Sequence, residues 1–252
     1  MIRALAVLLA LAAAPAAAQE AIVSGLSQNR VSITADFDGS EILVYGAVKR
    51  DSPAPEGDMG VIITIEGPAT PLMVRRKDRV WGIWINNAAV AVDSAPSFYA
   101  VATTGPLTDV LSATENLRHG ITIDRVIRAV GITSEADASE AFIEAMMRVR
   151  TAEGRYRLLD GRVELTDQTL FRADVTLPAN LTEGGYKVRL FLLRGGKVVA
   201  EQARLIDVRK EGLERLIYNL AQDQPLAYGL LSLALAAFAG WAASAVFRLI
   251  RN

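Results

Sequence analysis

A short basic and aromatic segment contains the residues best suited to chemistry in this sequence. Its members are, in order, Arg75, Arg76, Lys77, Arg79, Trp81 and Trp84. Four basic residues against the single acid Asp78 leave a local charge of +3 in a nearly neutral chain. Guanidinium groups bind phosphates and carboxylates through paired hydrogen bonds, and Arg and Trp are enriched at binding hot spots. The segment therefore predicts a site for an anion, a lipid headgroup or a protein partner.

A plainer interpretation of the same segment is a solvated hairpin end that leads into a strand over Val80–Val92. Alternate side chains of that strand would then carry the tryptophans into the core. Residues three apart on an extended strand point to opposite faces, so Trp81 and Trp84 can both be buried only if both faces are covered. We expect one of them to be a surface aromatic, and both interpretations of the segment stay open.

The other titratable residues do not form a known catalytic or metal-binding pattern. The lone His119 precedes Gly120 at a predicted helix end, where it would interact with the helix dipole. Several carboxylates lie in turns without EF-hand spacing, which predicts turn chemistry rather than calcium binding. They are Asp36, Asp38, Asp51, Glu56 and Asp58. The sequence has no G-x-S-x-G, P-loop, dinucleotide or H-E-x-x-H motif, so we expect no catalytic residues, no metal and no cofactor.

Composition excludes further classes of function. The 252 residues contain 27 basic and 28 acidic side chains, which disfavours nucleic acid as a partner. The chain has no cysteine, so structural disulfides and thiolate catalysis are impossible. Its mean hydropathy of +0.25 is high for a soluble protein. Two apolar segments, one at each end, account for this value.

The first apolar segment has the three parts of a secretory signal peptide over residues 1–18. Arg3 supplies the positive charge, and residues 4–14 form an apolar stretch too short to cross a bilayer. Ala16 and Ala18 fit the small-residue rule for signal peptidase, which predicts cleavage between Ala18 and Gln19. The alternative is an uncleaved N-terminal anchor.

The second apolar segment, residues 225–247, carries no charge and as a helix would reach about 34 Å, enough to cross a bilayer. Arg248 and Arg251 follow in a tail over residues 248–252, which we expect in the cytoplasm. The alternative is a buried helix of a soluble core. Residues 210–224 before it predict an amphipathic helix that lies on the outer leaflet or packs under the body. Its apolar stripe is Leu213, Leu216, Ile217 and Leu220.

Small residues recur at near four-residue spacing along the predicted membrane helix. They are Gly229, Ser232, Ala236, Gly240 and Ser244. Such a row lets a second helix approach closely in lipid, where packing drives association. It predicts self-association or contact with another membrane protein, and the alternative is a generic alanine-rich anchor.

Between the two apolar segments the sequence predicts a mainly β body. Apolar or alternating runs separated by Gly, Pro and Asp turns favour an antiparallel, immunoglobulin-like β-sandwich, with one part over residues 19–105 and a hairpin-rich part over residues 154–209. Sequence alone leaves open whether these form one sandwich or two. The expected strands are Val31–Phe37, Glu41–Lys49, Gly60–Glu66, Val80–Val92, Phe98–Thr103, Leu170–Leu177, Tyr186–Leu193 and Val198–Val208.

Residues 106–153 change to helical periodicity and predict a helical insertion packed on the sandwich by one stripe. Pro106 suits the first turn of a short helix that ends near Leu111, and Ser134 suits the N-cap of a longer one. The stripe of the longer helix is Ala138, Ala141, Phe142, Ala145 and Val149. The segment over residues 121–130 is ambiguous, and we favour helix.

Several motifs resemble a family of alphaproteobacterial transmembrane proteins. They are Leu43–Ala47, Val74–Arg79, Gly82–Asn86, Pro96–Thr104 and Pro106-Leu107. The resemblance spans nearly the whole chain, with its signal peptide, exported domain and C-terminal helix. It implies a periplasmic domain held in the inner membrane of a Gram-negative bacterium, and a sulfite-exporter-like membrane permease as a partner, but no activity.

Two classes of function remain at this stage. The first is a membrane-anchored periplasmic accessory or binding protein without enzymatic activity, whose partners are inner-membrane lipid and a permease or a second copy of the chain. The second is an envelope hydrolase with an unrecognised Asp, Glu and Ser site. A hydrolase needs titratable groups that converge in a pocket, and here the carboxylates are scattered through turns. We therefore favour the first class.

Overall fold

The computed structural model describes residues 20–34, 36–50, 57–129, 136–210 and 213–251. The predicted signal peptide, residues 51–56 of the acidic turn and the predicted Ser134 cap lie outside the described residues. The strands are β1 (Glu20–Leu26), β2 (Arg30–Ile33), β3 (Gly39–Arg50), β4 (Met59–Glu66), β5 (Ala69–Val80), β6 (Ile83–Pro96), β7 (Tyr99–Thr103), β8 (Tyr156–Leu159), β9 (Glu164–Thr166), β10 (Leu170–Pro178), β11 (Gly184–Arg194) and β12 (Lys197–Lys210). The helices are α2 (Leu107–Val110), α3 (Ala113–His119), α4 (Ile123–Val126), α5 (Ala136–Ala152), α6 (Leu213–Asp223) and α7 (Pro225–Arg251).

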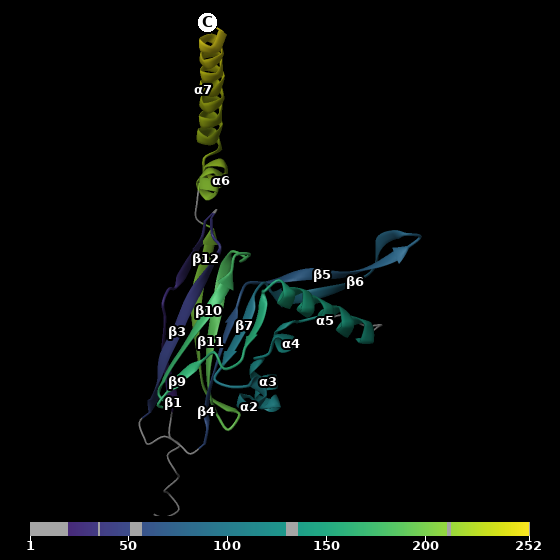
Figure 1. Cartoon of the computed structure of the whole chain (residues 1–252), viewed down its shortest axis with the longest axis vertical. Coiled ribbons are helices and arrows are strands. Elements are labelled where there is room, and N and C mark those ends of the chain that lie inside the picture. Colours follow the sequence, from purple (N-terminus) through teal and green to yellow (C-terminus); the bar gives the residue numbers. More distant parts are fainter. Residues whose placement is uncertain (1–19, 35, 51–56, 130–135, 211–212, 252) are drawn as a thin grey trace, which may run out of the picture.

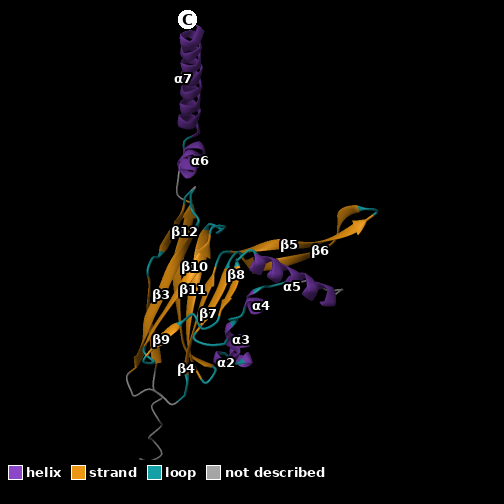
Figure 2. Ribbon diagram, viewed as in Figure 1, coloured by secondary structure: helices purple, strands orange, loops and turns teal. Residues whose placement is uncertain are grey.

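Two packed sheets form the body, as Figures 1 and 2 show. Sheet A has the order β1-β3-β10-β9, and sheet B has the order β2-β12-β11-β4-β7-β8. Each sheet combines strands from before and after the helical insertion, so the body is one sandwich. The mainly β fold with a few helices and one C-terminal apolar helix is confirmed. Most pairings are antiparallel, but β2 with β12 and β7 with β8 are parallel.

The apolar pattern of each strand explains how many of its faces are covered. Strand β10 alternates, and only Phe171, Ala173, Val175 and Leu177 are buried, so sheet A has one face in the core and one in solvent. Strand β4 is buried over Met59–Ile65 and is apolar there except for Thr64, because helices α2 to α4 cover the outer face of sheet B. The insertion therefore completes a second core layer.

The β11–β12 hairpin is confirmed at its predicted place. Gly195 and Gly196 form its turn with φ of 52° and 78°, a conformation that glycine adopts without steric cost. Two other elements are shorter than the sequence predicted. Strand β2 ends at Ile33 rather than Phe37, and the predicted helix over residues 121–130 shortens to α4, after which Arg128 forms an isolated bridge with Ser94.

Helices α6 and α7 follow β12 and extend away from one end of the sandwich (Figure 1). The amphipathic segment and the apolar segment are thus both helical, as predicted. The apolar helix runs to Arg251, and residues 225–244 within it are long and apolar enough to cross a membrane. No part of the most apolar stretch of that span is buried against the rest of the described chain.

Candidate functional site

The basic and aromatic segment lies on a long two-stranded arm, formed by β5 and β6, that projects from the sandwich (Figure 2). Trp81 and Gly82 make its turn, with φ of 51° and 83°. The prediction of a single strand over Val80–Val92 was therefore wrong, because the chain reverses inside that range. Apolar residues stand directly on both sides of Gly82, and tryptophan is a poor turn signal, so the sequence did not reveal the reversal.

Large apolar side chains are exposed at the end of the arm, which we call the tip (residues 77–86). Trp81 is 97% exposed, Ile83 67% and Trp84 65%. The interpretation that carried the tryptophans into the core is wrong, because neither face of the tip is covered. The interpretation of a solvated hairpin end holds for the position of the cluster. One surface aromatic was expected, and there are two.

The basic residues follow β5 toward the tip, and all four are exposed. The Arg76 Nε lies 3.4 Å from Asp78 Oδ2, and its guanidinium lies over the ring of Phe142 on α5, 5.9 Å from the centroid. Within the part of the chain that the structure describes, neither Lys77 nor Arg79 forms an ion pair. These two charges, nearest the turn, are available to a ligand.

Helix α5 supports the base of the arm. Val92 and Ala95 of β6 and Met146 of α5 are buried together, with Leu72 and Val74 of β5 packed against them. Helix α5 therefore packs on the arm and on β8 rather than broadly on the sandwich, which corrects the expected packing. The predicted stripe is also only partly right, because Phe142 is buried but Ala141 and Val149 are exposed, and Met146, which the prediction did not include, is buried. This contact fixes the direction in which the arm leaves the body.

A groove of about 470 Å³ runs between β5 and α5. Its apolar walls include Met73, Val149 and Met146. Most of its charged groups are engaged: Arg150 donates hydrogen bonds to the Pro96 and Ser97 carbonyl oxygens at 3.3 and 3.2 Å, and Arg155 pairs with Glu153 at 3.2 Å. The groove therefore offers a shape but few free polar groups.

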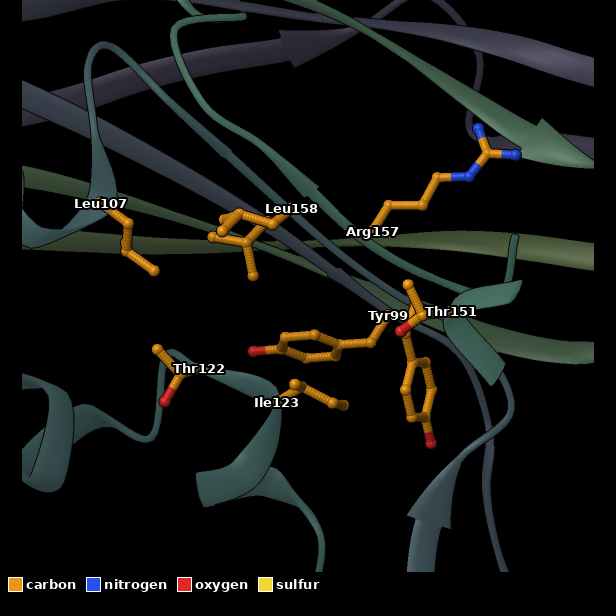
Figure 3. A pocket seen from close by; sticks show the side chains of 9 residues that line it. Tyr99, Leu107, Thr122, Ile123, Thr151, Arg157 and Leu158 are labelled. Carbon is orange, nitrogen blue, oxygen red and sulfur yellow. The ribbon is translucent and has the colours of Figure 1, made fainter. Parts of the chain in front are cut away.

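A smaller pocket of about 200 Å³ lies between β7, β8 and the short helices, and Figure 3 shows its lining. The Tyr99 hydroxyl lies inside it but donates to the Ile121 carbonyl oxygen at 2.7 Å, and burial raises the pKa of Tyr99. Tyr156 donates to the Pro96 carbonyl oxygen at 2.9 Å. The side chain of Arg157 points away from the pocket (Figure 3). Both tyrosine hydroxyls of the pocket are therefore engaged by backbone carbonyl oxygens.

His119 belongs to a charged network that holds α3 on sheet B. Its Nδ1 lies 3.2 Å from Glu201 Oε2, and Arg189 Nε donates to the other Glu201 oxygen at 2.9 Å. Burial alone would raise the pKa of Glu201, but Arg189 and His119 lower it below its ordinary value. Ser112 caps the start of α3, and Gly120 ends the helix in the left-handed conformation. His119 is thus the last residue of the helix, as the sequence predicted. The network is structural, and sequence reasoning missed it because its members are distant in the chain.

The remaining carboxylates and small residues give no further cluster. Among the described residues, no group of three His, Asp or Glu side chains could hold a metal ion. In the α7 row, a Cβ added at Gly229 or Gly240 would meet nothing within 4 Å. The row is therefore not filled by the rest of the described chain, and its role in helix packing stays a prediction.

These observations define a class: a β-sandwich that carries a projecting arm and a C-terminal helix fit to cross a membrane. The chain belongs to the family described as "Putative transmembrane protein (Alph_Pro_TM)", whose sequence profile matches residues 21–249. This confirms the family indicated by the sequence motifs. Family and helix together indicate a single-pass membrane protein.

Comparisons with other proteins add little beyond the family. No curated protein sequence matches the chain. The crystal structure of Spo0M, a sporulation control protein from Bacillus subtilis, is similar over 81% of this chain at 10% identity and a TM-score of 0.29. The chain spans about half the length of that protein, 55%. BslA, described as a bacterial hydrophobin, is similar over 77% of this chain and 97% of its own, at 11% identity and a TM-score of 0.21. These TM-scores are too low to bear on function.

Proposed function

We propose that this protein is a non-enzymatic accessory protein, held in the inner membrane by α7 with its sandwich in the periplasm. The observation that carries the proposal is the arm, whose tip exposes two tryptophans and unpaired basic side chains away from the core. Exposed aromatic and basic residues on a rigid support are typical of recognition surfaces.

The placement of ionisable groups supports a binding role over a catalytic one. The described carboxylates and tyrosines with shifted pKa values each have a structural explanation. Glu20 is held by Arg50 and Arg194, and Glu201 by Arg189. Catalytic sites gather such groups around a cleft, whereas Glu20 and Glu201 lie apart. The two tyrosines that share the smaller pocket, Tyr99 and Tyr156, both donate their hydroxyls to backbone carbonyl oxygens.

The expected partner is an inner-membrane transporter, which the arm or α7 would contact. Two features favour a membrane-embedded partner over a soluble one. The helix brings the body permanently to the bilayer, and its row of small residues suits close contact with another membrane helix. Anchoring also raises the effective concentration of the arm for any protein in the same membrane.

Topology is tested first. Protease added to spheroplasts should digest the body, and a reporter active only in the periplasm should work when inserted between Asp51 and Asp58. Full protection of the body in intact spheroplasts would refute a periplasmic location.

Partner binding is tested by purifying the full chain from detergent-solubilised membranes and identifying the proteins that remain bound. A transporter should co-purify with the wild type. It should be lost when Ala236 and Gly240 become leucine. Recovery of the chain alone under mild detergent and after cross-linking would overturn the accessory role.

A further inference from the structure

We propose that the tip of the arm is a second membrane contact, which inserts its apolar side chains at the bilayer interface and binds anionic phospholipid headgroups through Lys77 and Arg79. The inference rests on the proposed function in one respect: the body and the arm must lie on the same side of the bilayer in which α7 is anchored. It names lipid as the ligand of the tip.

The first observation is backbone strain that the folded chain does not compensate. Trp81 has φ of 51°, a left-handed conformation that is an outlier for a bulky residue, yet its side chain is 97% exposed. Asparagine or glycine would form the same turn at lower cost. Strain of this kind persists where another requirement fixes the residue, and no contact with another described residue does so here.

The second observation is that apolar side chains occupy both faces of the tip. Val80 pairs with Ile83, and Arg79 with Trp84. Neighbouring pairs in a two-stranded ribbon point to opposite faces, so one tryptophan-bearing face and one aliphatic face are exposed together. A folded protein partner would cover one face of such a ribbon. A bilayer interface surrounds the tip and covers both.

The composition of the tip matches the layers of that interface. Tryptophan prefers the headgroup level, where its ring is in an apolar region and its N–H meets polar groups. The cationic groups of Lys77 and Arg79 come before Val80 and the turn, so they would lie at the phosphates when Trp81 and Ile83 lie deeper. Neither cation has an ion-pair partner within the described ranges, so binding a phosphate breaks no existing contact.

The architecture brings the tip toward the membrane. In Figure 1 the arm rises from the sandwich toward the end from which α6 departs, and its tip lies near the level of that end. Helix α5 holds the base of the arm through Met146 and Val92. A single apolar contact binds a bilayer weakly on its own, but α7 already confines the chain to the surface, so a modest affinity is sufficient.

The test uses the full chain in lipid nanodiscs and its own fluorescence. The chain has three tryptophans, so the variant Trp241→Phe leaves emission from Trp81 and Trp84 alone. In discs of equal parts phosphatidylcholine and phosphatidylglycerol we expect blue-shifted emission, quenching by acyl-brominated lipid, and protection from acrylamide. In discs of phosphatidylcholine alone, and at high salt, the shift and the protection should be weaker.

Charge variants in the same background separate headgroup binding from apolar insertion. Lys77→Gln with Arg79→Gln should lower the ratio of inserted to free tip about 30-fold, since each charge near an anionic surface contributes about fivefold. The matched control, Lys187→Gln with Lys197→Gln, removes two exposed lysines of the sandwich and should change nothing. All variants alter exposed residues, so circular dichroism should show the same fold.

Two results would overturn the proposal. Tip tryptophans that stay open to acrylamide and unquenched by brominated lipid in anionic discs would show that lipid is not the ligand. If a transporter still co-purifies with the chain, the proposed accessory role survives that result, and the tip serves a protein. Insertion that is equal in both lipids and unaffected by the charge variants would exclude anionic headgroup recognition.

Discussion

The start of the first strand depends on a buried carboxylate, and its removal should cost more than any surface ion pair. The Glu20 side chain is 3% exposed and lies between two arginines. Arg50 Nε donates to Oε1 at 2.7 Å, and Arg194 donates through Nη2 at 2.9 Å and Nε at 3.1 Å. Glu20 thereby ties β1 of sheet A to β11 of sheet B.

Glu20→Ala should lower the free energy of unfolding by about 3 kcal/mol, because it leaves two poorly hydrated guanidinium groups without their counter-ion. For a body of this size that corresponds to a fall in Tm of about 6–12 °C. The control is Glu164→Ala, whose ion pair with Arg172 at 3.2 Å is 70% and 59% exposed. It should cost no more than about 1 kcal/mol.

The same carboxylate predicts a pH dependence. The hydrogen bond from Arg194 lowers the pKa of Glu20, burial opposes it, and Arg50 lowers it further, for a net decrease from 4.5. A carboxyl group whose pKa is lower in the folded than in the unfolded protein stabilises the fold. This contribution is complete at pH values above the unfolded-state pKa and is lost as the pH falls through the folded-state pKa. The difference in Tm between wild type and Glu20→Gln should therefore be constant near neutrality. It should shrink toward zero as the pH falls below about 4.5.

The assay is thermal unfolding of the full chain in detergent, followed by near-ultraviolet circular dichroism over a series of pH values. A Glu20→Ala variant that melts within the range of the Glu164→Ala control would refute the reasoning. So would a gap between wild type and Glu20→Gln that stays unchanged into strong acid, since the charge would then not be the stabilising element.

Two further changes test the packing of the sandwich and of the membrane helix. Gly46→Ala should destabilise the body by about 1–3 kcal/mol, because the added Cβ would lie 2.5 Å from Phe171 Cζ and 2.6 Å from a backbone oxygen. The control is Gly185→Ala, whose Cβ would meet no atom within 4 Å and which should leave Tm unchanged in the same thermal unfolding assay. Ala236→Leu with Gly240→Leu should leave membrane insertion intact but reduce self-association or partner contact in cross-linking, and full retention of both would make α7 a simple anchor.

The strands of the sandwich could be predicted where the local pattern of apolar residues fits only one structure. Leu170–Leu177 alternates because one face is in solvent. Gly60–Glu66 is apolar except for Thr64 and Glu66 because both faces are covered. Paired glycines at 195 and 196 fixed the turn between β11 and β12. In each case the burial or the backbone angle that the fold requires is visible in residues adjacent in the sequence.

Other strands escaped prediction because their stability comes from distant partners. Strand β1 pairs with β3 through seven residues but has only a weak alternation of its own. Strand β8 pairs in parallel with β7 across the whole helical insertion. Whether the body was one sandwich or two depended on such pairings, which no local window contains.

The arm shows the same limit at the candidate site. Its residues were identified as the strongest candidate for binding, but the turn at Trp81 and Gly82 was not, because tryptophan is a poor signal for a left-handed turn. A two-stranded ribbon of this length is marginally stable in water unless something packs on it. Helix α5 supplies that packing through Met146, so helix α5 and the arm form one packed unit. A change that loosens α5 should then impair recognition by the tip without touching a residue of the tip itself.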